Sequence, residues 1–227
     1  MIRTGLMKSG IILLALCFID NASTAQENGP RVDKFKQLGP ELATPNDYRT
    51  ASGAPGHEYW QQQADYVMKI RLDDATQKLY GEETVTYHNN SPDVLSYLWL
   101  QLDQNIFDKE SDSYAIEQTT IGDRMTANDL VDLEPWFDGG FKLEYVKDAS
   151  GKDLDYTINK TMMRIDLPAP LKAGGTYTFR IKWWYNINDR IRIGGRSGYE
   201  YFDTDKNYLY TIAQFYPRMV VYSDNQG

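Results

Sequence analysis

A regular alternation of apolar and polar residues is the feature that most constrains how this chain can fold. In the first such segment the apolar positions are Tyr66, Met68, Ile70 and Leu72. Lys69 and Arg71 lie between them and would point the other way, because successive side chains of a β-strand alternate between its two faces. We therefore expect this segment to be a strand that buries one face against a core.

Further segments show the same signature or a short apolar run. They lie at residues 84–88, 94–102, 163–167, 177–183, 208–213 and 219–222. The nearly continuous apolar run at 94–102 predicts a strand covered on both faces, and residues 168–175 are expected to be a loop. No stretch keeps a 3.6-residue stripe, although residues 113–136 are ambiguous. The chain is therefore expected to be all-β, an antiparallel β-sandwich or saddle.

A hairpin is expected in the middle of the chain. The alternating positions are Phe141, Leu143 and Tyr145 in one segment and Leu154, Tyr156 and Ile158 in the next. The residues between them, Asp148 to Lys152, are typical of a turn. The pattern predicts that the two segments pair with each other through this turn.

The first 25 residues have the order of a secretory signal. Basic residues precede the apolar run 11–19, and small residues precede a cut after Ala25. No later segment approaches the ~20 apolar residues that a membrane span needs. We expect residues 1–25 to be a signal peptide, 26–57 an extended leader, and 58–227 the folded β-domain of a periplasmic or secreted protein. The single cysteine, Cys17, would leave with the signal, so no disulfide framework is expected.

The charge of the chain argues against two classes of partner. Its formal net charge is −8, which repels the phosphates of nucleic acids and anionic lipid surfaces. Neither nucleic acid nor membrane is therefore expected as a partner, and solubility alone accounts for the charge.

One stretch resembles a zinc-protease motif but lacks its second ligand. His57 and Glu58 begin like H-E-x-x-H, but the fifth position is Gln61, and an amide is a poor zinc ligand. The other histidine, His88, has no partner at ligand spacing and is expected to be a half-buried residue at a strand end. We expect no metal ligand and no catalytic residue in this chain.

Three other patterns allow a functional and a structural interpretation. Residues 203–207 resemble the start of a calcium loop without its glycine, so a polar hairpin turn is favoured and a weak Ca²⁺ contact stays open. Residues 194–198 are glycine-rich but lack the ending of a phosphate loop, and are interpreted as a turn. Residues 183–185 with Tyr199 and Tyr201 could form a sugar platform. Core packing is preferred, because only one of two adjacent tryptophans can face inward.

Two stretches carry a family resemblance. Residues 66–73 and 79–89, followed by a leucine-rich run, resemble the opening strands of aminopeptidase N-like zinc metallopeptidases, the gluzincins, where the second strand opens with Leu-x-Gly. Gly81 is expected to permit close backbone approach at a bulge. Residues 209–218 resemble the family segment in which an aromatic strand runs into Thr-Gln-x-Gln/Glu, with Ile212 in place of the usual glutamine.

The resemblance implies a domain and its place in a larger enzyme. It implies the N-terminal, substrate-capping β-saddle domain of an exported aminopeptidase, docked on an intramolecular catalytic domain. That domain would hold Zn²⁺ through H-E-x-x-H and a further glutamate, all beyond residue 227. The chain would then be incomplete at its C-terminal end, bind no cofactor and be inactive alone.

The resemblance also implies one substrate-binding residue. Gln214 matches the family's Gln or Glu that reaches the free α-amine at the N-terminus of the peptide substrate. An amide that only satisfies strand-edge backbone groups is the other interpretation of Gln214. The alternative for the whole chain is a stand-alone exported β-sandwich module that binds glycans or proteins. It predicts a monodisperse product with saturable binding, whereas a fragment predicts exposed apolar edges and aggregation.

Overall fold

The computed structural model describes residues 45–116, 124, 126 and 137–224. The expected signal peptide and the first part of the leader lie outside these residues, as does most of the ambiguous stretch 113–136. Within the described part, no helix is long and apolar enough to cross a membrane.

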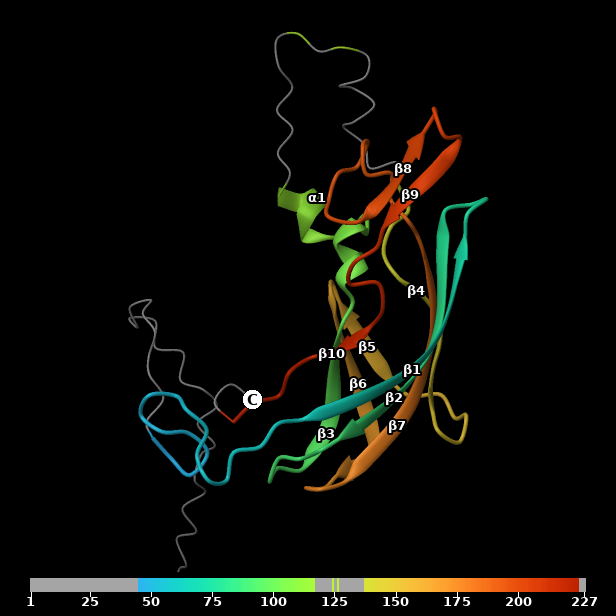
Figure 1. Cartoon of the computed structure of the whole chain (residues 1–227). Coiled ribbons are helices and arrows are strands. Elements are labelled where there is room, and N and C mark those ends of the chain that lie inside the picture. The colour runs from blue at the N-terminus through green and yellow to red at the C-terminus, as the bar shows by residue number, and fades with distance from the viewer. Residues whose placement is uncertain (1–44, 117–123, 125, 127–136, 225–227) are drawn as a thin grey trace, which may run out of the picture. The chain divides into compact units, whose positions relative to one another are not determined.

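Two antiparallel four-stranded sheets make up most of the described region (Figure 1). The first sheet has the strand order β1 (Gln63–Asp73), β2 (Lys78–His88), β7 (Thr176–Asn186) and β4 (Lys142–Asp148). The second has the order β10 (Arg218–Met219), β3 (Leu95–Gln101), β6 (Met162–Leu171) and β5 (Tyr156–Asn159). A separate hairpin consists of β8 (Gly198–Phe202) and β9 (Asn207–Thr211), and two short helices are η1 (Asp103–Phe107) and α1 (Asp112–Ile116). The prediction of an all-β antiparallel sandwich is confirmed.

The hydrophobic core is built from alternate residues of both sheets. The fully buried side chains include Val85, Phe179, Ile181 and Trp183 of the first sheet and Leu100, Met163 and Ile165 of the second. Every second side chain of these strands points to the same face, which explains the period-two pattern seen in the sequence. The strands expected at 163–167 and 177–183 are thereby confirmed.

Gly81 is required by a side chain and not by a bulge. It pairs in regular register with Ile70 on one side and Trp183 on the other, so the bulge expected here is absent. A Cβ atom on Gly81 would collide with the indole ring of Trp183. The close approach that the sequence predicted is therefore between a backbone and a ring.

Two predictions about covered strand faces were wrong. Ile70 and Leu72 on β1 are exposed, because the edge strand of the second sheet, β10, has two residues against the eleven of β1. On β3, Tyr97 and Trp99 are also exposed. Both strands thus bury a smaller part of their apolar surface than the sequence suggested.

The hairpin expected between residues 141 and 158 forms only next to its turn. The amide of Asp148 donates to the carbonyl of Lys152 at 2.9 Å, an antiparallel bridge joins Lys147 and Asp153, and the amide of Leu154 donates to the carbonyl of Val146 at 2.9 Å. The chain then crosses to the other sheet, so that β4 pairs with β7 whereas β5 pairs with β6. A register shift in β4 also turns Val146 into the core and leaves Tyr145 on the opposite face, where its hydroxyl donates to Glu82 at 2.8 Å.

The loop expected at 168–175 begins later than predicted. Strand β6 continues through Pro168 to Leu171, which lies opposite Leu95 of β3. The pairing is irregular between Leu95 and Tyr97, as expected where prolines cannot donate hydrogen bonds to a neighbouring strand.

The described end of the leader, residues 45–57, makes ordered contacts. A bridge joins Arg49 and Pro55, and the Nε atom of Arg49 donates to both carboxylate oxygens of Asp224 at 2.8 Å. The hydrogen bond from this guanidinium lowers the pKa of the Asp224 carboxyl. The two ends of the described chain are therefore joined by an ion pair.

Candidate functional site

The connection from β9 to β10 presents the one residue that the sequence singled out for substrate binding. Strand β9 ends at Thr211, and Gln214 lies in the middle of the connection with an exposed side chain and a φ of 50°. A residue with a Cβ adopts this left-handed conformation at a cost of roughly 1–2 kcal/mol. The surrounding structure must therefore stabilise it.

Gln104 of η1 supplies part of this stabilisation. Its side chain is 4% exposed, and its Nε2 atom donates to the carbonyl oxygens of Ala213 at 3.1 Å and Gln214 at 3.2 Å. One buried amide thus satisfies two successive carbonyl groups of the turn. The sequence analysis did not identify Gln104, and only a contact between residues 110 positions apart could have revealed it.

An ion pair fixes the end of the connection where β10 begins. The Nε atom of Arg218 lies 2.7 Å from Oδ2 of Asp103, and its Nη2 atom donates to Oε1 of Gln101 at 2.9 Å. The hydrogen bond that Arg218 donates to Asp103 raises the pKa of Arg218. Because Asp103 is the first residue of η1, the same short helix holds the connection through Asp103 and through Gln104.

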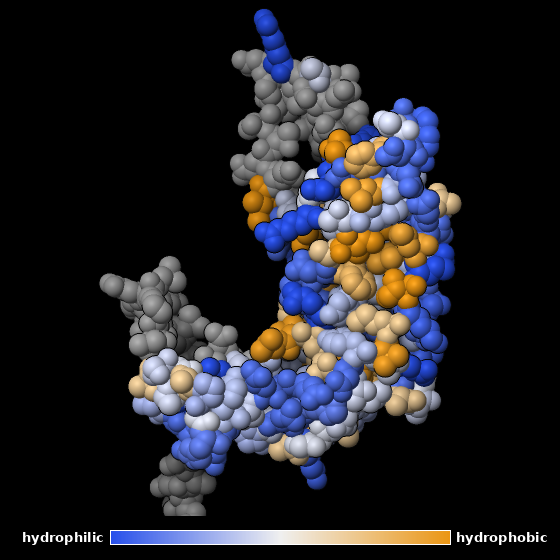
Figure 2. Space-filling view, viewed as in Figure 1, coloured by the Kyte–Doolittle hydropathy of each residue, from blue (hydrophilic) through white to orange (hydrophobic). Residues whose placement is uncertain are grey.

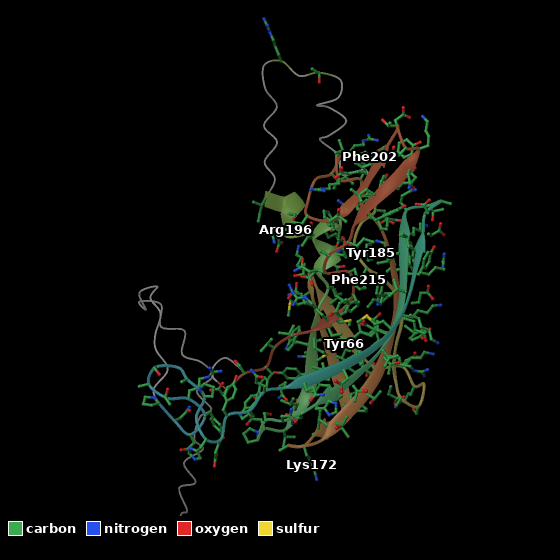
Figure 3. All side chains as sticks on the ribbon, viewed as in Figure 1. Tyr66, Lys172, Tyr185, Arg196, Phe202 and Phe215 are labelled. Atoms are coloured by element: carbon green, nitrogen blue, oxygen red, sulfur yellow. The ribbon has the colours of Figure 1, made fainter. Side chains whose placement is uncertain are left out.

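Aromatic packing anchors the residues between Gln214 and β10. The rings of Phe215 and Tyr216 lie 5.1 Å apart edge to face, and Tyr216 contacts Tyr66 of β1 at 5.4 Å between ring centroids. Phe215 and Tyr66 are labelled in Figure 3. The hydroxyl of Tyr66 also accepts a hydrogen bond from the amide of Met219 at 2.8 Å. These contacts direct Phe215 and Tyr216 toward the core and leave the Gln214 amide pointing outward.

Four tyrosines lie on the hairpin that precedes this connection, and we call them the tyrosine cluster: Tyr199, Tyr201, Tyr208 and Tyr210. Tyr201 and Tyr208 are closest, at 4.9 Å between ring centroids. The hydroxyl of Tyr210 donates to Oδ1 of Asp74 at 2.6 Å, and burial together with this carboxylate raises the Tyr210 pKa. The cluster therefore connects the β8–β9 hairpin to the turn between β1 and β2.

The chemistry available at Gln214 is recognition and not proton transfer. A side-chain amide offers one acceptor oxygen and two N–H donors but does not titrate. Among the described residues, none hydrogen bonds to this side chain, so its acceptor oxygen and its N–H donors are both available to a ligand. The interpretation of Gln214 as an amide that satisfies strand-edge backbone groups receives no support from the hydrogen bonds of the described region.

No described group of three or more His, Cys, Asp or Glu residues could hold a metal ion. The side chain of His57 is 74% exposed and lies 4.0 Å from Glu58. His88 ends β2 and contacts Oδ2 of Asp65 at 2.8 Å, as expected for a half-buried residue at a strand end. The described residues therefore do not provide the donor set of a zinc site.

The other patterns of the sequence have structural roles. Residues 203–206 form the turn between β8 and β9, and residues 194–197 lie in the connection from β7 to β8, as predicted. Trp183 is fully buried and Tyr185 nearly so, whereas Trp184 lies on the other face near Tyr80. A sugar platform across residues 183–185 is therefore excluded.

A buried carboxyl group was missed by the sequence analysis. Glu83 on β2 is fully buried, and neither of its oxygens has a hydrogen-bond partner; the same is true of the indole nitrogen of Trp183. Burial raises the pKa of Glu83 to about 9. The alternation of β2 contained the signal, because Glu83 shares a face with Gly81 and Val85.

Comparisons with known proteins return zinc peptidases among solved structures. No family model matches the chain, and no curated protein matches it. The chain is similar to an M1 zinc metallopeptidase from Deinococcus radiodurans, with 13% identity over 59% of this chain and 22% of that one, at a TM-score of 0.35. It is also similar to a mutant of this M1 zinc metallopeptidase bound to the substrate Tyr-Ser-Ala, with 14% identity over 65% and 26% of the two chains and a TM-score of 0.36. The chain spans about a quarter of the length of these structures.

Proposed function

We propose that this chain is the N-terminal, substrate-capping β-domain of an exported zinc aminopeptidase, in which Gln214 binds the free α-amine of a peptide. The observation that carries the proposal is the geometry of Gln214: its exposed amide has no hydrogen-bond partner among the described residues and lies in a left-handed turn held by Gln104. The resemblance of residues 66–73, 79–89 and 209–218 to the gluzincins supports it.

The chemistry of a peptide amine suits this position. An α-amino group has a pKa of about 7.7–8.0 and is largely protonated at neutral pH, so it is a strong hydrogen-bond donor. The Oε1 atom of Gln214 can accept one such bond. A neutral amide lacks the full countercharge of a carboxylate, so the interaction would be weaker than one made by Glu. An acceptor at this place favours peptides whose N-terminus is not blocked.

Hydrolysis would belong to another part of the protein. The described residues do not fit a zinc site, because His57 and His88 each lack the further ligands that a metal needs. We assign no zinc-dependent step to this chain and propose that it is inactive alone. Residues 1–25 would direct export, residues 26–57 would form the leader, and the β-domain from residue 58 onward would cap a catalytic domain.

Nuclear magnetic resonance of the ¹⁵N-labelled chain tests the role of Gln214. A short peptide with a free N-terminus is expected to shift the side-chain amide signals of Gln214 and the backbone amide signals of residues 213–216, whereas the same peptide with an acetylated N-terminus is not. In Gln214→Ala the two peptides should no longer differ in their effect on these backbone signals. Gln77→Ala is a matched control and should keep the difference, since Gln77 is also a glutamine in a turn, with a φ of 49°. Equal shifts with both peptides, or an unchanged difference in Gln214→Ala, would contradict the proposal.

A binding module for glycans or proteins is the second candidate. Tyr201 and Phe202 on the β8–β9 hairpin favour it, because both are more than two-fifths exposed and aromatic faces stack on sugars. Titration with oligosaccharides while these hairpin resonances are monitored separates the two functions. Saturable shifts confined to the hairpin would support the module, and shifts confined to Gln214 would support the peptidase domain.

A further inference from the structure

The outer edge of β1 is long and unpaired. Strand β1 is the end strand of the first sheet, with eleven residues, and no other described residue adds to its open side. Edges of this kind are ready templates for another strand. Val67 is 71% exposed, and Ile70 and Leu72 are also exposed. Apolar side chains gather over the half of β1 that leads to the turn with β2 (Figure 2).

The hydrogen-bonding pattern shows which residues of β1 face outward along the sheet. At the two ends of the β2–β7 ladder, the amide of Ile187 donates to Gln77 and the amide of Asn89 donates to Gly175. Odd-numbered residues of β2 therefore bond to β7, and even-numbered ones bond to β1. In the β1–β2 register even residues of β2 lie opposite odd residues of β1. The free backbone groups of the edge thus belong to residues 64, 66, 68, 70 and 72.

We propose that β1 pairs antiparallel with β1 of a second copy of this chain, about a two-fold axis at Met68. This inference does not rest on the proposed peptidase role. The axis brings even residues opposite even residues, so that the free backbone groups of both strands can bond. The residues that then lie opposite each other are Asp65 and Arg71, Tyr66 and Ile70, and Ala64 and Leu72. Each of these pairs occurs twice, once on either side of the axis.

Charge complementarity, together with the number of residues that pair, selects this register. A two-fold axis at Lys69 would place Asp65 opposite Asp73. An axis at Ile70 would place Lys69 opposite Arg71. Both are pairs of like charge, which destabilise a sheet. The axis at Met68 opposes Asp65 to Arg71 and uses all eleven residues of the strand. It also brings the exposed Ile70 and Leu72 against apolar residues of the second copy.

Both charged residues are already held near the surface of the strand. Asp65 accepts hydrogen bonds from His88 at 2.8 Å and Gln63 at 2.9 Å. The guanidinium of Arg71 lies 3.9 Å from the ring centroid of Tyr80. These contacts limit the conformations of both side chains, so less entropy is lost when they meet across the interface.

Sedimentation velocity of the full chain over a range of concentrations tests the interface. A dimer is expected, with twice the 26.2 kDa mass of the chain. Asp65→Arg should weaken it about tenfold or more, because two opposite-charge pairs are replaced by two like-charge pairs. Asp65→Arg combined with Arg71→Asp should restore the dimer, since the pair is only exchanged.

Control variants make the test specific to this register. Asp155→Arg makes the same charge change at an exposed position just before β5 of the other sheet and should leave the dimer unchanged. An axis at Val67 would instead place Asp65 opposite Lys69. If Lys69→Asp restores the dimer of Asp65→Arg and Arg71→Asp does not, the proposal is overturned. A chain that stays monomeric, forms only larger aggregates, or dimerises equally well with Asp65→Arg would also overturn it. Circular dichroism of each variant confirms that the fold is kept.

Discussion

The indole ring of Trp183 occupies the space that a side chain on Gly81 would need. The two residues are paired across β2 and β7, and the atoms nearest to a Cβ built on Gly81 are all in the buried ring of Trp183. This contact explains a glycine in the interior of a strand, a position that glycine otherwise weakens.

Gly81→Ala is therefore expected to destabilise the chain. Its methyl group has no free volume, and overpacking of this kind costs about 1–3 kcal/mol. Chemical denaturation monitored by tryptophan fluorescence measures the change. Trp183→Leu should make the additional cost of Gly81→Ala smaller than in the wild-type chain. An Ala at position 81 that costs nothing would contradict the packing described for Trp183.

The buried carboxyl group of Glu83 should make the free energy of unfolding fall as the pH rises. Its pKa is about 9 in the folded chain and near 4.5 when the group is exposed. Between pH 4.5 and pH 9 the folded state keeps a proton on Glu83 that the unfolded state releases. The contribution of Glu83 to the free energy of unfolding is therefore most favourable below pH 4.5 and is lost as the pH rises toward 9. Glu83→Gln should raise the free energy of unfolding at pH 7 by on the order of 2–3 kcal/mol and flatten the pH dependence.

Thermal unfolding between pH 4.5 and 9 provides the measurement for Glu83→Gln. Glu58→Gln is the matched control, because it removes a carboxylate that is exposed. The control should keep the slope of the wild-type chain. Equal slopes in the wild-type chain and in Glu83→Gln would show that Glu83 is ionised when buried.

Gln104→Ala should release the connection that presents Gln214. Two carbonyl groups lose their hydrogen bond, and the expected loss of stability is about 1–2 kcal/mol. Faster hydrogen exchange of the backbone amides at residues 213–216, with unchanged exchange in β7, is the expected local signature. Exchange that increases equally in all strands would indicate a general loss of stability in place of a positioning role.

Tyr210→Phe should detach the β8–β9 hairpin from the first sheet. The change removes only the hydroxyl that donates to Asp74. We expect a loss of about 1 kcal/mol or less, because the pair is exposed. Hydrogen exchange of the β9 amides should increase. Tyr208→Phe, on the same strand, is the control, and an equal effect of both substitutions would contradict the role given to the Tyr210 hydroxyl.

The strands of the core could be predicted because their pattern is local. At residues 163–167 and 177–183 each buried side chain is two positions from the next, and this spacing follows from the geometry of one strand. The position of Gln214 next to a strand end was likewise visible in the sequence. Its left-handed backbone was not, because Gln has no general preference for φ values above zero.

The sequence by itself determined that this chain is all-β and which residues of its central strands point inward. Only the tertiary structure decided that β4 and β5 join different sheets, that Ile70 and Tyr97 stay exposed, and that Gln104 holds the turn at Gln214. The physical reason is distance along the chain. Alternation is set by neighbouring residues, whereas strand partners, covered faces and the Gln104 contact depend on residues tens of positions away, whose meeting is decided by the packing of the whole sandwich.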